Sequence, residues 1–263
     1  MIAHLYYPRI IAHRGGGALA PENTLAGLRI AQRMGCRGVE FDVALTADAV
    51  PILLHDETLE RTTNGAGCVA AKTAAEVACL DAGGKHHRAF AVEPARPAGL
   101  SPSLESTLGV PTFQAAFQTC TELGLWMNVE IKPTPGTEAV TGHVVASAVA
   151  AHLAVHPAAA IVLSSFSVLS LQQAMQVVPT VPRALLMETI PADWRGQLAS
   201  AGASALHTAA AGMTAERIAP LCNSGIPLAC YTVNDRATAD TLFAAGVSAI
   251  FTDRIDLWTP EEM

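Results

Sequence analysis

The 263-residue sequence is short of positive charge. It contains 16 Lys and Arg against 23 Asp and Glu, which gives a formal net charge of -7 at pH 7 with neutral histidines. A nucleic acid or an anionic membrane surface would have to be bound against overall repulsion. We therefore expect no nucleic-acid partner and no stable membrane association, and the charge balance favours a small-molecule ligand.

We expect neither a targeting segment nor a membrane-spanning segment in this sequence. Residues 1–9 contain no apolar core followed by a small-residue cleavage site. The longest apolar stretch, residues 144–163, is interrupted by two histidines and a proline, and it predicts a helix followed by a strand rather than a membrane span. We expect a cytoplasmic protein, and the sequence leaves its oligomeric state open.

Paired cysteines are absent as well. The 6 cysteines are scattered, form no Cys-x-x-Cys motif and stand mostly among apolar neighbours. This pattern predicts buried, reduced thiols with structural roles.

The sequence does contain a regular alternation of apolar strand-like runs and helical patterns. The runs cover residues 9–13, 38–45, 50–55, 125–132, 160–165, 183–187, 203–207, 227–233 and 248–252. The helical patterns cover residues 23–34, 112–123, 137–156, 167–177, 193–201, 214–224 and 235–245. Alternation implies parallel strands with right-handed crossovers, and about eight such units close naturally into a barrel.

We therefore predict a single TIM (β/α)8 barrel domain over residues 1–263, with a small insertion after the second strand. Glycines and prolines interrupt the periodicity in the second part of residues 56–111. We predict that residues 56–111 form this insertion and cap the barrel mouth.

Two strands carry acidic residues in positions that suggest a cation site. Glu40 and Asp42 are two residues apart on a strand, so both side chains point to the same face. Glu130 precedes Lys132 by the same spacing on a later strand. Burying such carboxylates without compensation would cost several kcal/mol each. Oxygen ligands alone favour one hard divalent ion, Mg²⁺ or Ca²⁺, over zinc.

An internal ion-pair network is the alternative interpretation of these acids. Arg14, Arg37 and Lys132 would then supply the compensating charges. Residue spacing alone leaves this alternative open.

Two histidines follow apolar strands. The run of residues 10–12 leads into His13, Arg14 and two glycines, and residues 50–54 lead into His55. Arginine presents a planar fork of donors and glycines let backbone N–H groups approach, so the first of these strand ends suits an anion. Because an imidazole titrates near neutral pH, His13 and His55 are candidates for a general acid and a general base.

Several other polar and aromatic residues are expected near the strand ends or in supporting positions. Phe166 and Tyr231 close strands and are candidates for lining the substrate mouth, or for apolar packing. His207 is expected at the rim or behind the catalytic groups. Asn23 is most simply a helix cap, Glu22 a rim residue, and Asp253 a hydrogen-bonding residue without a chemical role. His86 and His87 are expected to be solvated.

An ordered series of motifs resembles the glycerophosphodiester phosphodiesterase family. In chain order the motifs are His13-Arg14-Gly15, Pro21-Glu22-Asn23-Thr24, Glu40-Phe41-Asp42-Val43, residues 55–65, Val129-Glu130-Ile131-Lys132, Ser164-Ser165-Phe166, Tyr231-Thr232-Val233-Asn234 and residues 246–253. The resemblance runs nearly from end to end, and it implies a TIM barrel with a small insertion after the second strand.

The resemblance also implies a reaction and a set of roles. The reaction is hydrolysis of glycerophosphodiesters to glycerol 3-phosphate and an alcohol, with a divalent metal. By position, His13 and His55 become the acid/base pair, the three acids become metal ligands, and Arg14 and Lys132 become phosphate contacts.

Three positions depart from the family pattern, which puts selectivity for the alcohol in question. Tyr231 stands where the family usually has Trp, and Gln114 where it often has an acid. Arg254 stands where the family often has Pro after the Thr-Asp pair. Two other functions stay open from the sequence: a phospholipase D-like hydrolase of lysophospholipids on the same barrel, and a noncatalytic phosphate-binding barrel.

Overall fold

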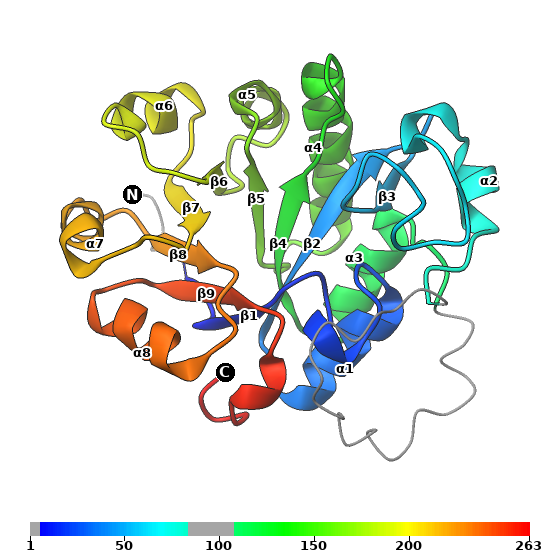
Figure 1. Cartoon of the computed structure of the whole chain (residues 1–263). Coiled ribbons are helices and arrows are strands. Elements are labelled where there is room, and N and C mark those ends of the chain that lie inside the picture. The colour runs from blue at the N-terminus through cyan, green and yellow to red at the C-terminus, as the bar shows by residue number, and fades with distance from the viewer. Residues whose placement is uncertain (1–5, 84–107) are drawn as a thin grey trace.

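The computed structural model describes residues 6–83 and 108–263, and its central feature is a closed parallel barrel (Figure 1). The barrel strands are β1 (Ile10–Ala12), β2 (Gly38–Leu45), β4 (Trp126–Ile131), β5 (Ile161–Ser165), β6 (Arg183–Met187), β7 (Ala205–Ala209), β8 (Leu228–Tyr231) and β9 (Ala249–Thr252). Each pairs in parallel with its neighbours, and β1 pairs with both β2 and β9, so the sheet closes on itself. The TIM-barrel prediction is confirmed.

The run predicted as a strand over residues 50–55 lies outside the barrel. Strand β3 (Pro51–Leu53) pairs antiparallel with the end of β2, and the expectation of parallel pairing for this run is wrong. Only residues 46–50 connect the two strands, whereas a parallel connection needs about a dozen residues or more. Strand β2 therefore extends beyond the barrel and the chain returns as a hairpin.

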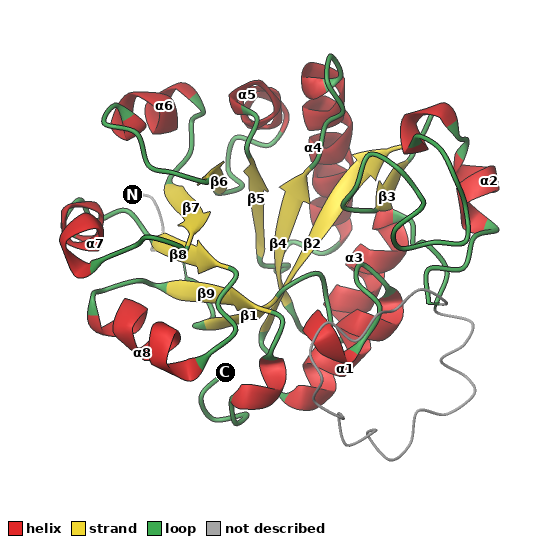
Figure 2. Cartoon of the chain, in the orientation of Figure 1, coloured by secondary structure: helices red, strands yellow, loops and turns green. Residues whose placement is uncertain are grey.

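Seven helices of the described chain surround the barrel, and one short helix lies in the excursion after β3 (Figure 2). The surrounding helices are α1 (Leu25–Met34), α3 (Phe113–Glu122), α4 (Glu138–Val155), α5 (Val168–Val177), α6 (Trp194–Ser200), α7 (Ala215–Cys222) and α8 (Arg236–Ala244), and the short one is α2 (Ala74–Ala78). Helix α1 ends at Gly35, whose φ of 97° is in the left-handed region that glycine adopts readily.

The start of α1 differs from the prediction. Thr24, not Asn23, caps the helix, and its hydroxyl accepts a hydrogen bond from the backbone N–H of Gly27 at 3.1 Å. Asn23 is turned instead toward the neighbouring strand β2. Its role is described with the site.

The barrel interior is apolar near the amino ends of the strands. Four neighbouring strands contribute small side chains there, from Ala184, Ala205, Ala229 and Ala249. The space that these alanines leave is filled by large residues, among them Tyr7 and Trp126, whose rings lie 5.1 Å apart. This layer fills the barrel at the amino ends of the strands, and the polar side chains lie at the carboxyl ends.

The excursion after β3 has a small core of its own in its described part. Leu59, Val69 and Val77 are buried there together with Ile52 of β3. Residues 84–107, including His86 and His87, lie outside the described residues, so the predicted cap over the barrel mouth stays a prediction.

Helix α4 is the one described helix that is long and apolar enough to cross a membrane by length and composition. In the structure it lies on the outside of the barrel beside α5. Only 28% of this helix is buried inside the protein.

The cysteine prediction is right for only part of the set. All are free: Cys36, Cys120 and Cys230 are buried, Cys222 is half-buried, and Cys68 and Cys79 are exposed. The expectation of burial is wrong for the last two, because both belong to the excursion, where the core is too small to cover every apolar side chain.

Candidate active site

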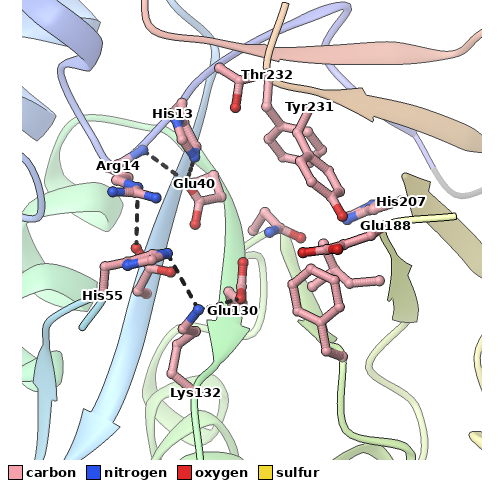
Figure 3. A pocket seen from close by; sticks show the side chains of 15 residues that line it. His13, Arg14, Glu40, His55, Glu130, Lys132, Glu188, His207, Tyr231 and Thr232 are labelled. Carbon is pink, nitrogen blue, oxygen red and sulfur yellow. Dashed lines mark hydrogen bonds and ion pairs between the residues drawn. The ribbon is translucent and has the colours of Figure 1, made fainter. Parts of the chain in front are cut away.

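A cavity of about 300 Å³ opens at the carboxyl ends of the barrel strands (Figure 3). Every residue that the sequence singled out for the site lines this cavity: His13, Arg14, Glu40, Asp42, His55, Glu130, Lys132, Phe166 and Tyr231. Phe166 is 46% exposed and lies at the mouth. The structure thus brings together side chains from strands that are far apart in the sequence.

Three carboxylates form a cluster on the β2 and β4 side of the cavity. Asp42 and Glu130 are register partners on these adjacent strands, and Glu40 lies one inward-facing position below Asp42. One oxygen from each carboxylate lies within 4.8 Å of the others. Glu40 and Asp42 are almost fully buried, so their charges are compensated mainly by neighbouring groups.

The cluster perturbs the proton affinity of its members. Burial, with the charge of Asp42 second, raises the pKa of Glu130 to about 7 and holds the pKa of Glu40 well above its usual range. Burial also acts to raise the pKa of Asp42, but Arg14, His55 and Lys132 together outweigh it and lower that pKa. Two neighbouring acids are therefore destabilised as anions while the third stays ionised.

These residues fit a hard divalent cation. The donor set consists of carboxylate oxygens only, and Oε1 of Glu40 is buried without a hydrogen-bond partner among the described residues. A divalent ion between the three side chains would offset the raised pKa values by supplying the missing positive charge. Glu40, Asp42 and Glu130 are thus the residues that would hold a metal.

Asn23 fixes the position of Asp42. Its amide nitrogen donates to Oδ2 of Asp42 at 2.9 Å, and its amide oxygen accepts from the backbone N–H of Asp42 at 3.1 Å. Asn23 has a φ of 56°, in the left-handed region that asparagine tolerates better than most residues. The helix-cap interpretation of Asn23 is wrong because this residue binds across to β2.

Two cations border the acids, as expected from the sequence. Nε of Arg14 lies 3.8 Å from Oδ2 of Asp42, and Nζ of Lys132 lies 3.3 Å from Oε1 of Glu130. Arg37, the third cation of the ion-pair alternative, is exposed and precedes β2, at the opposite end of the strand from Asp42. The alternative is therefore wrong for Arg37.

His13 is held from behind by a carboxylate. Its Nδ1 lies 2.7 Å from Oδ1 of Asp253, and Oδ2 of Asp253 accepts a hydrogen bond from the side-chain amide of Asn234 at 3.0 Å. The other ring nitrogen, Nε2, lies 3.9 Å from Oε2 of Glu40. A hydrogen bond from Nδ1–H to Asp253 leaves Nε2 to exchange a proton in the cavity.

His55 is held in the same way by a different part of the chain. Its Nδ1 lies 2.6 Å from Oδ1 of Asp56, and its Nε2 lies 3.4 Å from Nζ of Lys132. His55 reaches the rim because the β2–β3 hairpin runs back toward the barrel, where the N–H of Leu54 donates to the carbonyl of Asp42. The location predicted from the sequence is right, although the strand that leads to it is antiparallel.

A chain of ion pairs along the rim connects the two histidine regions. Arg61 pairs with both Asp56 and Glu22, and Glu22 also accepts a hydrogen bond from Arg14 at 3.0 Å. Hydrogen bonding to Arg61 lowers the pKa of Asp56 to about 2. Asp56 therefore stays ionised as the partner of His55.

His207 does not lie at the rim. It lines the cavity from β7 but is fully buried, and its Nε2 is hydrogen-bonded to the hydroxyl of Tyr7 at 3.0 Å. Of the two alternatives expected for His207, the rim is wrong, because the inward-facing position two residues further on, Ala209, is the one at the end of the strand. The alternative of a buried position behind the site agrees with the structure.

Comparison with known proteins gives this geometry a family. Residues 13–257 match the model of the glycerophosphoryl diester phosphodiesterase family. The chain belongs to this family. A glycerophosphodiester phosphodiesterase from Caldanaerobacter subterraneus subsp. tengcongensis is 30% identical over 249 residues, which cover 93% of each chain. One from Bacillus subtilis is 30% identical and covers 94% of this chain and 84% of the relative.

Solved structures support the same family assignment. An Oleispira antarctica phosphodiesterase, in complex with the product sn-glycerol-3-phosphate, superposes with a TM-score of 0.82 at 30% identity and covers 94% of this chain and 93% of the other. A protein from Silicibacter pomeroyi that has been assigned to the glycerophosphoryl diester phosphodiesterases superposes with a TM-score of 0.78 at 26% identity. The superposition covers 98% of this chain and 93% of the other.

This family member has supporting residues that the sequence did not single out. Asp253 was given no chemical role, yet it is the partner of His13, and Asp56 is the partner of His55. The position of Asp56 directly after His55 was a usable signal, whereas Asp253 lies 240 residues from its partner. Thr232, which belongs to the motif of residues 231–234, also lines the cavity, as does Glu188, which no sequence pattern marked.

Proposed function

We propose that this family member hydrolyses glycerophosphodiesters to glycerol 3-phosphate and an alcohol in the cavity at the barrel mouth. The observation that carries the proposal is the arrangement of two carboxylate-held imidazoles, His13 and His55, around one cluster of three buried acids. Phosphate binding alone would not require two such proton-transfer groups beside an acidic cluster.

The cations would hold the phosphate. Arg14 and Lys132 both line the cavity, and each lies beside an acid that neutralises part of its charge. Their N–H groups would bind the nonbridging oxygens and offset the negative charge that increases in the transition state. When bound by Glu40, Asp42 and Glu130, Mg²⁺ or Ca²⁺ would supply Lewis-acid stabilisation of the phosphate and of the attacking oxygen.

The histidines would move the protons. One imidazole accepts through Nε2 the proton of the attacking oxygen, which belongs to water or to a glycerol hydroxyl, as the new phosphorus–oxygen bond forms. The other donates a proton to the alcohol oxygen as the old phosphorus–oxygen bond breaks. If the glycerol hydroxyl attacks, a cyclic phosphate results, and the two imidazoles exchange roles as water opens it to glycerol 3-phosphate. Asp253 and Asp56 would keep Nδ1 of each ring protonated and hold the rings in place. Phe166 and Tyr231 would bind the organic part of the substrate at the mouth.

The test is an activity assay with purified protein. Glycerophosphocholine, glycerophosphoethanolamine and lysophosphatidylcholine would each be incubated with Mg²⁺ or Ca²⁺, and release of glycerol 3-phosphate or of lysophosphatidate would be followed. We expect glycerol 3-phosphate from the first two substrates, no activity in EDTA, and recovery when the metal is restored. Hydrolysis of lysophosphatidylcholine alone would favour the phospholipase D-like function, and binding without hydrolysis would favour a noncatalytic barrel.

A matched pair of variants tests the metal ligands. Glu40→Gln should weaken metal binding and so change how activity depends on the metal concentration. Glu57→Gln should leave this dependence unchanged, because Glu57 is exposed and does not line the cavity. Activity that neither EDTA nor Glu40→Gln alters would remove the metal from the mechanism. The cytoplasmic location and the absence of stable membrane association stay predictions, which cell fractionation would test.

A further inference from the structure

The cavity has two walls of different chemistry (Figure 3). The strands β1, β2 and β4 and the loop after β3 carry most of the charged groups: the two histidines, the three acids, Arg14 and Lys132. Glu188, which follows β6, also lines the cavity. Uncharged polar groups come from Asn128 of β4, His207 of β7 and Tyr231 of β8. We call these three residues the neutral wall.

Each residue of the neutral wall has a buried polar atom without a hydrogen-bond partner among the described residues. These atoms are Oδ1 of Asn128, Nδ1 of His207 and the hydroxyl of Tyr231. Asn128 is 1% and His207 0% exposed, so these two residues have little access to bulk water. Leaving a buried polar group without a hydrogen bond is unfavourable, so three such groups in one cavity indicate a ligand with several hydrogen-bonding groups.

The Asn128 side chain has an unpartnered acceptor in the cavity. Its amide nitrogen donates to the hydroxyl of Ser164 on the adjacent strand at 2.9 Å. This bond fixes the orientation of the amide and leaves Oδ1 as an acceptor.

The contact with Tyr7 determines what His207 offers. Burial lowers the pKa of His207 to about 3, so the imidazole is neutral and carries one proton. If the phenol of Tyr7 donates to Nε2, the proton is on Nδ1 and only this N–H lacks a partner. The reverse arrangement would leave both Nδ1 and the phenol hydrogen unpaired. The first arrangement satisfies more groups, and it makes Nδ1–H a donor.

We propose that the neutral wall binds the hydroxyl groups of the glycerol moiety and makes the enzyme selective for glycerol over a plain alkyl phosphate; this rests on the proposed function. A hydroxyl group needs both a donor and an acceptor. Nδ1–H of His207 and Oδ1 of Asn128 supply one of each, and the hydroxyl of Tyr231 can act as either. The glycerol side of the substrate, which carries the hydroxyl groups, is therefore the part assigned to these three residues.

The selectivity can be measured by product binding, without turnover. Calorimetric titration in saturating Mg²⁺ would compare sn-glycerol 3-phosphate with n-propyl phosphate, which shares the phosphate and the carbon chain but lacks both hydroxyls. We expect the wild-type protein to bind sn-glycerol 3-phosphate about 10–100-fold more tightly, because a site built to hydrogen-bond a hydroxyl discriminates against an analogue without it.

Variants assign this preference to the neutral wall. His207→Phe should reduce it to less than about threefold while changing the affinity for n-propyl phosphate by no more than about twofold. Tyr231→Phe should reduce it in the same direction, and it decides the question if the His207 variant does not fold. Thr208→Val is the matched control: Thr208 also has a buried, unpartnered hydroxyl, but it does not line the cavity, so the preference should be unchanged.

The outcomes separate this inference from the proposed function. Equal wild-type affinities, or a His207 variant that weakens both ligands equally, would overturn the role of the neutral wall even if the enzyme hydrolyses glycerophosphodiesters. Retention of the full preference in folded His207→Phe and Tyr231→Phe would overturn it too. A preference that depends on His207 in a protein without hydrolytic activity would support this inference and contradict the proposed function.

Discussion

The two histidine regions share a geometry but differ in what holds them. His13 is fixed by Asp253, which is hydrogen-bonded to Asn234 within the barrel end. His55 is fixed by Asp56, which is held by Arg61, a side chain that is 47% exposed. The first region depends on hydrogen bonds from successive barrel strands and loops, and the second on an ion-pair chain along the surface.

This difference predicts unequal sensitivity to solution conditions. The Debye length is about 10 Å at 0.1 M salt and shortens as salt is added, so exposed ion pairs weaken, whereas partly buried hydrogen bonds are screened much less. The His13 region should therefore be insensitive to ionic strength and the His55 region moderately sensitive. The predictions below test this comparison, beginning with the largest effect.

Removal of either imidazole should have the largest effect. We expect His13→Ala and His55→Ala each to lower turnover of glycerophosphocholine by about 10²–10⁴-fold, because general acid/base groups contribute rate factors of that size. The measurement is kcat from glycerol 3-phosphate release. Metal-induced thermal stabilisation should persist in both variants, and near-normal turnover in one of them would remove that histidine from the mechanism.

The carboxylates behind the histidines should have the next largest effect. Asp253→Asn should lower kcat by about 10–100-fold, because the amide no longer stabilises the imidazolium or fixes the tautomer of His13. Asp56→Asn should cost less, since the exposed ion pairs that hold Asp56 contribute little in water. A larger loss in Asp56→Asn than in Asp253→Asn, measured with the same substrate, would reverse the comparison.

The acids between the histidines predict a dependence of stability on pH. Burial raises the pKa of Glu130 from 4.5 to about 7 in the metal-free protein, so the folded state holds a proton that the unfolded state has lost. Stability should therefore fall as pH rises between about 4.5 and 7. In EDTA, we expect the wild-type Tm to fall across this window by roughly 5–7 °C more than that of Glu130→Gln.

Restoring the metal supplies the control for that prediction. Mg²⁺ or Ca²⁺ should raise the wild-type Tm more at pH 8 than at pH 6, because the ion must displace the proton at lower pH. A wild-type protein with the same pH dependence as Glu130→Gln would contradict the raised pKa.

The smallest effect is expected at the surface ion pairs. Arg61→Gln should lower kcat by roughly two- to fivefold and remove most of the dependence of kcat on NaCl. Arg236→Gln is the control, since Arg236 pairs with Glu262 on an exposed surface that does not line the cavity. Equal salt dependence in all three proteins would show that the rim ion pairs do not support His55.

The barrel and the acidic cluster were predictable from the sequence for physical reasons. The spacing of Glu40 and Asp42 fixes their common face in any strand, and the alternation of strands with helices fixes the closed sheet. The contacts that support the site were less predictable. Asp253 contacts His13 only because β1 and β9 pair to close the barrel, and no local sequence pattern predicts that pairing.

The helix-cap interpretation of Asn23 and the rim alternative for His207 differ from the structure for similar reasons. Asn23 has the residue type of a helix cap, but its left-handed backbone turns the amide toward Asp42. His207 follows an apolar run like His13, but its strand continues by two further residues, so the ring is buried rather than at the rim. In both cases the tertiary structure decides between roles that the local sequence permits equally.

The hairpin beyond β2 makes the site modular. The barrel supplies the three carboxylates and one imidazole, whereas the second imidazole comes from a loop outside the eight-stranded architecture. Replacement of residues 46–56 would therefore exchange His55 for another group at the cavity without altering the strands that carry the three carboxylates.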